Sequence, residues 1–394
     1  MLTNIAHIID WLLWAIIAVS TLYVVVFAFA SLLPSRNRKA VNDGDSGHNR
    51  FIVLFPAYHE DEVILSSVET FLKQDYPRNS YQVIVISDHM TAETNDSLAC
   101  LPISLLTPTF KKSSKAHALQ YAISNIPNTF PTGKATHAVI LDADNHVAPD
   151  FLSRLDNLCR QGYRAIQCHR TAKNADNNIA ALDGVSEEIN NTIFRKGHNR
   201  IGLSSALIGS GMCFDYDWFH SHVSQLRSAV EDRELEAMLL KERVHIHYAE
   251  NILVMDEKVS NTDNFQRQRL RWMTGQVQAL FHMLPYLPKA LIKGNVNYID
   301  KTIQQALIPR SILLAVIPIV ALVITIVSPL QSIKWWALFL LLCLSLLIAL
   351  PPQLRTSSLF KQVLTLPRLV WHLLKNLFHI DRKNTDFIHT SHNK

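Results

Sequence analysis

The sequence lacks the short motifs of the commonest nucleotide-dependent enzymes. No GxGxxG and no GxxxxGK[ST] phosphate loop occurs among the 394 residues. Their absence argues against dinucleotide-dependent oxidoreductases and P-loop ATPases. Internal repeats are also absent, and the five cysteines form no CxxC pair, which indicates reduced, small hydrophobic residues.

The charged residues are not arranged for binding nucleic acid. The 38 lysines and arginines form no dense tract, and the net charge of +5 suits the anionic inner surface of a membrane. Among the eighteen histidines, His245 and His247 lie on one face of an expected strand, but no third ligand lies near them in the sequence. We therefore expect no nucleic-acid partner and no zinc site.

Long hydrophobic runs are abundant. Hydrophobic residues make up 48% of the chain and the mean hydropathy is +0.09, which is high for a wholly soluble protein. Residues 11–33 carry no charge and would span about 34 Å as a helix, enough to cross the hydrocarbon layer. Residues 311–328 and 333–350 flank a turn at Pro329 and predict a transmembrane hairpin.

The distribution of cations predicts an orientation in the membrane. Residues 1–10 contain no Lys or Arg, whereas Arg36, Arg38 and Lys39 directly follow the first run. We expect the N-terminus outside and the large hydrophilic part and the C-terminus in the cytosol, at the bacterial inner membrane. A cleaved signal peptide ending near residues 28–30 is the alternative, but the run is too long and has no cationic leader.

Composition divides the chain into six parts. Apolar residues recur at helical spacing over 359–378 with cations among them, which predicts an interfacial helix on the inner leaflet rather than one packed on the soluble domain. Residues 281–292 are interpreted in the same way. The parts are an N-terminal transmembrane anchor (1–35), a linker (36–49), a cytosolic α/β domain (50–280), an interfacial segment (281–305), a transmembrane hairpin (306–352), and an interfacial helix with a cytosolic tail (353–394).

Short apolar runs alternate with amphipathic segments after residue 50. This alternation predicts βαβ units and a mostly parallel, buried sheet. Strands are expected at 51–55, 82–87, 103–106, 138–141 and 165–168, and helices at 61–74, 115–126, 150–160, 179–195 and 232–241. Ligands gather beyond the carboxyl ends of such strands, so the residues that follow each strand are candidates for a binding site.

Two carboxylates follow the fourth expected strand. Asp142 and Asp144 are separated by one small residue, and such a pair can share a hard cation with a diphosphate, because Mg²⁺ and Mn²⁺ favour oxygen ligands. The alternative is a turn or a cap of the following helix. Their place directly after a buried strand favours the metal site.

Polar residues at three further strand ends fit the same site. They are Pro56, Ala57, Tyr58 and Glu60 after the first strand, Asp88 after the second, and Lys115 at the start of the helix after the third. Tyr58 can stack on a base, Asp88 or Glu60 can accept a hydrogen bond from its ring NH, and Lys115 can face phosphate. Alternatively, Glu60 belongs to a first helical turn and Lys115 is solvated.

A second pair of carboxylates lies farther along the chain. Glu231 and Asp232 precede an expected helix, and a carboxylate near an acceptor hydroxyl would act as a general base. Capping of that helix is the alternative. Before this pair, Gly209, Ser210 and Gly211 predict a turn.

Residues Gln268–Trp272 read QRLRW and lie on an expected basic helix at 265–281. There, Arg269 or Arg271 can stabilise a diphosphate as negative charge develops on it, and Trp272 can stack against a sugar ring. The alternative is an ordinary basic helix near the membrane. Together with the paired carboxylates, this segment suits sugar transfer from a nucleotide.

Taken in order, these motifs resemble those of the membrane-bound family-2 glycosyltransferases. This group includes hyaluronan, chitin, cellulose and poly-N-acetylglucosamine synthases and ceramide glucosyltransferases. The resemblance covers residues 50–280 and the flanking apolar runs; a DxD alone is weak, whereas the ordered series ending in QxxRW is highly specific. It implies a GT-A (Rossmann-like) fold, a donor that is most often a UDP-sugar, a Mg²⁺ or Mn²⁺ cofactor and inversion at the anomeric carbon.

The resemblance also implies roles for individual residues. The implied donor-binding residues are Pro56, Ala57, Tyr58, Glu60, Asp88, Lys115, Asp142, Gln268, Arg271 and Trp272. Asp144, with Asp142 alongside, would bind the metal ion. Asp232, next to Glu231, matches the catalytic base. The acceptor path would be lined by Gly209, Ser210, Gly211 and Trp272.

The sequence departs from the polymer-exporting members in having only three apolar runs long enough to span a membrane. We therefore expect transfer to a lipid-linked or membrane-proximal glycan acceptor, with a processive polysaccharide synthase as the first alternative. Extra helices for a pore would have to come from a homo-oligomer, partner subunits or interfacial segments. A catalytically inactive nucleotide-sugar-binding subunit is a further alternative, and a transporter has too few spans.

Overall fold

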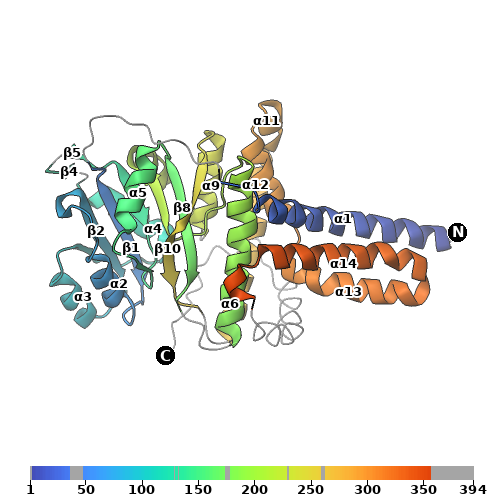
Figure 1. Ribbon diagram of the computed structural model, residues 1–394. Helices are drawn as coiled ribbons and strands as arrows, with labels where there is room; N and C mark the ends of the chain where they lie inside the picture. Colours follow the sequence, from blue (N-terminus) through green and yellow to red (C-terminus); the bar gives the residue numbers. More distant parts are fainter. Residues whose placement is uncertain are drawn as a thin grey trace.

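The computed structural model describes residues 2–35, 48–127, 129–131, 133–173, 178–228, 230–258 and 262–355. Figure 1 shows a central sheet covered by helices, with three long helices extending from one side of it. The expected interfacial helix at 359–378 and most of the expected linker lie outside the described residues.

Within those ranges, one sheet of eight strands forms the centre of the hydrophilic part, in the order β3-β2-β1-β6-β9-β8-β10-β7. The strands are β1 (Phe51–Tyr58), β2 (Tyr81–Asp88), β3 (Ser104–Leu106), β6 (His137–Ile140), β7 (His146–Val147), β8 (Ala165–Ala172), β9 (Met212–Asp215) and β10 (Ile246–Asp256), and β4 (Thr129–Phe130) and β5 (Gly133–Lys134) form a separate ribbon. Strand β9 runs antiparallel to both β6 and β8, and β7 runs antiparallel to β10. The expected parallel arrangement is therefore found from β3 to β6 and between β8 and β10, but the sheet as a whole is mixed.

Side chains of β1 alternate between two hydrophobic cores, one on each face of the sheet. Phe51, Val53 and Phe55 belong to one core, and Ile52 and Leu54 belong to the other. The first core is covered by α2 (Ile64–Phe71), α3 (Ala92–Ala99) and α5 (Phe151–Arg160), and the second by α4 (Lys115–Asn125), α8 (Tyr216–His222) and α9 (Glu231–Lys241). Burial on both faces fixes the sheet rigidly, so the residues at its edge are held in place.

Helix α2 begins later than the sequence suggests. Its first turn, from Ile64, contains no acidic residue, so Glu60 and Asp61 precede the helix and the alternative that placed Glu60 in a first helical turn is wrong. Asp61 instead accepts hydrogen bonds from the backbone N and the hydroxyl of Thr91, both at 2.8 Å. These bonds join the segments that follow β1 and β2.

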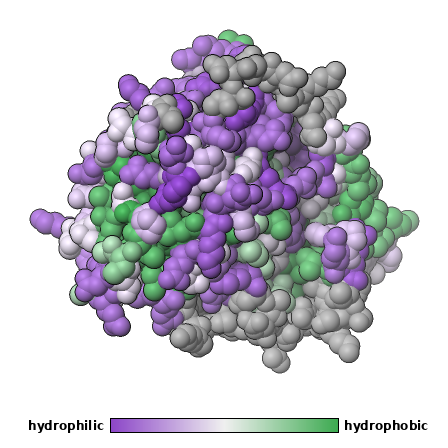
Figure 2. All heavy atoms as spheres, turned by 60° about the vertical axis from the view of Figure 1, so that its left-hand side comes forward, coloured by the Kyte–Doolittle hydropathy of each residue, from purple (hydrophilic) through white to green (hydrophobic). Residues whose placement is uncertain are grey.

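In the part of the chain that the structure describes, three helices are long and apolar enough to cross a membrane. They are the residues His7–Ala30 of α1 (Leu2–Ala30), α13 (Arg310–Val327) and α14 (Pro329–Ala349). They lie side by side in Figure 1, and their shared core contains Ile17, Ile317 and Trp335. Side chains on their outer faces are exposed; the exposed fraction of Ile326, for example, is 86%. By contrast, the face of the sheet domain in Figure 2 is largely hydrophilic around smaller hydrophobic areas.

Helix α1 is fixed at both ends. Near its start, Asp10 pairs with Lys334 of α14 at 2.5 Å and accepts a hydrogen bond from Trp335 Nε1 at 2.8 Å. Near its end, Phe27 stacks on His198, with ring centroids 3.5 Å apart. His198 follows a π-helical segment (Asn191–Gly197) that continues α6 (Asn178–Asn190). The first span is thereby attached to the hydrophilic domain.

The expected interfacial segment contains two different helices. Helix α11 (Leu287–Ile292) exposes Leu291 and Ile292, as an interfacial helix would. Helix α12 (Val296–Ala306) instead buries five of its eleven residues, and it packs against α9 and α10 (Thr262–Met283). Its residues therefore belong to the packed domain and connect it to α13.

Candidate active site

The carboxyl ends of β1, β2 and β6 meet at one edge of the sheet. Tyr58 of β1 is paired in register with Asp88 of β2. The backbone N of Leu141, which follows β6, donates a hydrogen bond to Leu54 O of β1 at 3.0 Å. The sheet therefore brings the candidates that follow the first, second and fourth expected strands to the same edge, as the sequence predicted.

A cluster of rings surrounds Asp88. His59 and His89 directly follow β1 and β2, and both have left-handed backbones, with φ of 53° and 56°. Their ring centroids lie 5.7 Å apart, and that of Tyr58 lies 4.5 Å from His59 and 5.7 Å from His89. His89 Nδ1 and Asp88 Oδ1 are 2.6 Å apart. The sequence predicted Tyr58 and Asp88 but not the histidines, whose positive φ at matched strand ends is a strained conformation typical of functional sites.

Lys115 joins three of the expected motifs. Its Nζ contacts the Asp142 carboxylate, donates to Gly209 O at 2.6 Å, and lies 3.8 Å from Glu231 Oε1. Lys115 is the first residue of α4, whose N-cap Ser114 accepts a hydrogen bond from His117 N. Helix α4, capped by a serine, thus directs the lysine at the carboxylates, and the alternative that Lys115 is merely solvated is wrong.

The glycine turn lies against the same charges. Gly209 has φ of +82°, and a Cβ added to it would lie 3.7 Å from Glu231 Oε1, 3.8 Å from Asp232 Oδ2 and 3.9 Å from Lys115 Nζ. Ser210 is fully buried and its hydroxyl contacts Asn145, while a Cβ on Gly211 would meet Val254 and Cys168. Gly209 therefore borders the site, whereas Ser210 and Gly211 pack into the interior and hold the turn in place.

Burial and neighbouring charges act in opposite directions on the pKa of each of the two central groups, Glu231 and Lys115. Burial raises the pKa of Glu231 to about 7, although the nearby Lys115 ammonium lowers it. Burial acts to lower the pKa of Lys115, but the carboxylates of Asp142, Glu231 and Asp232 outweigh it and raise that pKa. Asp232 itself accepts a hydrogen bond from Arg233 N at 2.8 Å. A carboxyl that titrates near neutral pH is suited to exchanging a proton with a substrate.

The Asp142–Asp144 pair follows β6 as expected. Asp144 Oδ1 accepts from Asn145 Nδ2 and Asp144 Oδ2 accepts from Glu257 N, both at 3.0 Å, so its carboxylate is oriented by β10. The Asp142 side chain is 37% exposed. In the described part of the chain no cluster of three or more His, Cys, Asp or Glu side chains could enclose a metal ion. Two oriented carboxylates fit Mg²⁺ or Mn²⁺, which commonly take their remaining ligands from phosphate and water.

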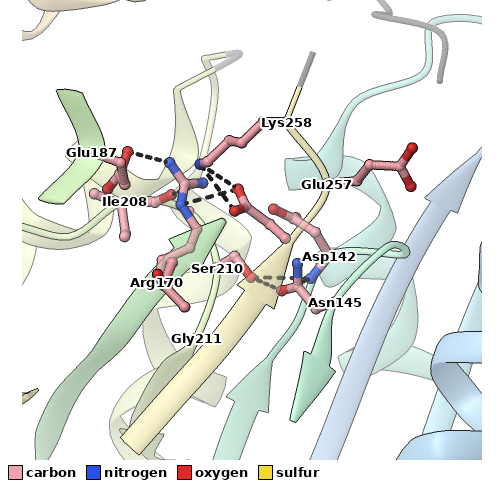
Figure 3. Close-up of polar contacts among 12 residues, drawn as sticks. Asp142, Asn145, Arg170, Glu187, Ile208, Ser210, Gly211, Glu257 and Lys258 are labelled. Carbon is pink, nitrogen blue, oxygen red and sulfur yellow. Dashed lines mark hydrogen bonds and ion pairs between the residues drawn. The ribbon is translucent and has the colours of Figure 1, made fainter. Parts of the chain in front are cut away.

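A buried network of charges lies beside these carboxylates (Figure 3). Arg170 of β8 pairs with Glu187 of α6 at 3.1 Å and with Asp256 of β10 at 3.5 Å, and Lys258 pairs with Asp256 at 2.9 Å. Burial alone would raise the pKa of Glu187, but Arg170 and Arg195 hold it well below its ordinary value. No residue of this network belongs to a recognisable motif, so the sequence did not predict it.

The QRLRW segment lies on α10, as expected. Arg269 pairs with Asp183 of α6 and lies over the Trp272 ring, with its guanidinium carbon 4.6 Å from the centroid. Arg269 is therefore engaged by α6. Gly275, one turn later, packs on Val230, the residue before Glu231. Helix α10 thus borders the segment that carries the second carboxylate pair.

Comparison with known proteins agrees with this arrangement. The family model described as glycosyltransferase like family 2 matches residues 48–275, more than half of the chain. The chain belongs to this family. It is therefore a glycosyltransferase, and the resemblance inferred from the sequence is confirmed.

Solved structures show the same fold at low sequence identity. The mannosyltransferase PcManGT from Pyrobaculum calidifontis, in complex with GDP-Man and Mn²⁺, aligns with a TM-score of 0.54 and 16% identity over 86% of this chain and 96% of that chain. S. aureus TarS in complex with UDP-GlcNAc aligns with a TM-score of 0.38 and 11% identity over 74% and 90%. The first likeness supports the expected GT-A fold of this family-2 glycosyltransferase, and the second is too loose to add to it. The search of curated proteins found no match.

Proposed function

We propose that this family-2 glycosyltransferase is a membrane-bound, inverting enzyme that transfers a sugar from a UDP-sugar to a lipid-linked or membrane-proximal glycan acceptor. The observation that carries the proposal is the position of Lys115. Its ammonium group joins Asp142 of the DxD pair, the Gly209 carbonyl and Glu231 of the second carboxylate pair. Metal-site, acceptor-side and base motifs, far apart in sequence, thus meet around one cation.

The donor binds along the edge formed by β1, β2 and β6. Tyr58 stacks on the uracil ring, and Asp88 accepts a hydrogen bond from its N3–H. Pro56, Ala57 and Glu60 complete the wall that follows β1. The diphosphate then extends towards Lys115, with Arg271, Gln268 and Trp272 of α10 closing the other side.

Asp144 and Asp142 would hold the Mg²⁺ or Mn²⁺ ion, which would supply positive charge to offset the charge that develops on the departing diphosphate. The mannosyltransferase PcManGT, which has a similar fold, was solved in complex with Mn²⁺, which supports this assignment. Asn145 and the Glu257 backbone orient the Asp144 carboxylate for the same purpose.

Asp232 acts as general base at the acceptor hydroxyl. The hydroxyl gives its proton to Asp232 while its oxygen forms a bond to the anomeric carbon. The bond from that carbon to the diphosphate breaks, its electron pair leaves on UDP, and the configuration inverts. Gly209, which has no side chain, borders Lys115 and the two carboxylates, so the acceptor would approach them over its backbone.

The three apolar helices support a location of this chemistry at the membrane. The cation distribution favours an N-terminus outside and a cytosolic domain at 50–280, where nucleotide sugars are made. Helix α11, with Leu291 and Ile292 exposed, would lie on the inner leaflet. The acceptor would then reach Gly209 from the bilayer side.

The test is release of UDP by the purified full-length chain in detergent, with UDP-sugars, membrane lipid extract and Mg²⁺ or Mn²⁺. Asp232→Asn is expected to lose transfer by at least about a hundredfold and to retain UDP binding. Asp217→Asn, on the exposed side of α8, is the matched control and keeps full activity. Wild-type transfer by the Asp232→Asn variant would remove the assigned base, and product length would separate single transfer from polymer synthesis.

A further inference from the structure

Helix α12 connects the active site to the membrane. Its residues Tyr298, Asp300, Lys301, Thr302 and Gln305 are buried, and only three residues separate its end at Ala306 from the start of α13. Helix α12 and three linking residues join the sheet domain to α13, whose first residue, Arg310, also donates a hydrogen bond to Ser186 O of α6 at 3.0 Å. A displacement of α13 relative to the sheet domain therefore acts on α12.

Gln305 binds both helices that carry the acceptor-side motifs. Arg233 of α9 donates a hydrogen bond from Nη1 to Gln305 Oε1, and Arg233 directly follows the proposed base, Asp232. Gln276 of α10 donates from Nε2 to Gln305 O at 3.1 Å and to Leu307 O at 2.9 Å. Because Gln276 lies one turn after Trp272, a single residue joins the base helix to the QRLRW helix.

The two helices also touch each other close to the site. A Cβ added to Gly275 of α10 would lie 2.5 Å from Val230 Cγ1, so only glycine permits this approach to the residue that precedes Glu231. The spacing between α9 and α10 is therefore set by Val230 on one side and by Gln305 on the other. A change at Gln305 would shift Asp232 relative to Trp272.

The opposite face of α12 is attached to the first span. Tyr23 of α1 donates from its hydroxyl to Asp300 Oδ1 at 2.8 Å, and His198 Nε2 lies 3.3 Å from Asp300 Oδ2. Beyond α12, Ile308 N donates to Ser20 Oγ at 3.2 Å. Helices α9 and α10 and the first two apolar helices, α1 and α13, thus meet at the stretch from Asp300 to Ile308.

We propose that Gln305 is a positioning residue that sets the geometry of the acceptor side of the active site and links it to the apolar helices α1 and α13. This inference rests on the proposed function. The donor-side residues are carried by β1, β2 and β6, whereas Gln305 bonds to α9 and α10. Its loss therefore impairs transfer to the acceptor while binding of the nucleotide is retained.

The experiment compares variants of the full-length chain in detergent micelles with acceptor lipid. Gln305→Leu removes the acceptor for Arg233 at nearly constant volume, whereas Gln305→Glu keeps an oxygen there. Gln276→Leu removes the two bonds from α10. Ile303→Ala, on the exposed face of α12, is the control. The measurements are UDP affinity by calorimetry, and kcat and acceptor KM for transfer.

Gln305→Leu and Gln276→Leu are each expected to lower kcat/KM for the acceptor by about tenfold, because small displacements of catalytic groups reduce rates steeply. UDP affinity is expected to stay within about twofold, and Gln305→Glu to recover most of the activity. If Gln305 only stabilised the fold, Gln305→Leu would lower kcat/KM for the acceptor and UDP affinity together, and Gln305→Glu would not restore them. Unchanged transfer by Gln305→Leu and Gln276→Leu, or a parallel loss of UDP binding in whichever of them folds, overturns the positioning role. A wild-type protein that transfers no sugar would instead overturn the proposed function, and the positioning role with it.

Discussion

Replacing Lys115 by methionine tests the electrostatics of the site directly. Methionine keeps the length of the side chain and removes the charge that faces Asp142 and Glu231. Two unit charges separated by 3.8 Å, as Lys115 Nζ and Glu231 Oε1 are, interact by about 4 kcal/mol at an effective dielectric constant of about 20. Since one pKa unit corresponds to about 1.4 kcal/mol, loss of the cation raises the pKa of Glu231 above 7 by about one to three units.

The sign of the effect on stability follows from this shift. Because the folded-state pKa of Glu231 lies above its ordinary value, its contribution to the free energy of unfolding is full at low pH and is lost as pH rises through about 7. In Lys115→Met the loss continues to higher pH. We expect the variant's deficit in unfolding free energy to grow by about 1.4–2.7 kcal/mol between pH 6 and pH 9.

The assay is thermal unfolding followed by tryptophan fluorescence in detergent, from pH 5.5 to 9.5, without nucleotide or metal. Lys111→Met, an exposed lysine before α4, is the matched control and should show no such pH dependence. Lys115→Arg keeps the charge and should follow the wild type. A deficit that is constant with pH, or equal to that of the control, would refute the electrostatic argument.

Three further predictions concern other parts of the molecule. Gly197→Ala places a methyl group against a backbone carbonyl of α1 and is expected to cost about 1–3 kcal/mol in unfolding free energy, more than Gly184→Ala, where the contact is with a side chain; denaturant titration in detergent compares the two. His89→Ala removes the partner of Asp88 and is expected to weaken UDP binding about three- to tenfold with little change in kcat, as calorimetry and kinetics would show. Asp144→Asn is expected to raise the Mn²⁺ concentration for half-maximal transfer at least about tenfold, and an unchanged metal titration would contradict its role.

The sequence predicted best those features that depend on local pattern. The three candidate membrane helices were visible as long apolar runs, and the strands β1, β2 and β6 as short apolar segments followed by polar residues. Because parallel strands bring their carboxyl ends to one edge, the convergence of Tyr58, Asp88 and Asp142 followed from that pattern. These expectations needed no knowledge of distant contacts.

Features that depend on pairing between distant residues were not predicted. Strand β9 has only four residues, and its antiparallel position between β6 and β8 is decided by the sheet that surrounds it. Arg170 and Glu187 carry no sign in the sequence that they pair with each other. Nothing in the sequence indicates that Asp10 pairs with Lys334 of α14. Each of these depends on a partner brought close only by folding.

The position of Lys115 also links donor binding to proton transfer. A diphosphate entering the site competes with Asp142 and Glu231 for the same ammonium group, because all three are anions. When the Lys115 ammonium pairs with the phosphate instead, Glu231 loses the cation that lowers its pKa and becomes a stronger base. Linkage requires the converse as well: protonation of Glu231 frees Lys115 and strengthens nucleotide binding. The Glu231 carboxylate, next to Asp232, would therefore become more basic only when the donor is bound. This favours sugar transfer to an acceptor over proton exchange in the empty enzyme.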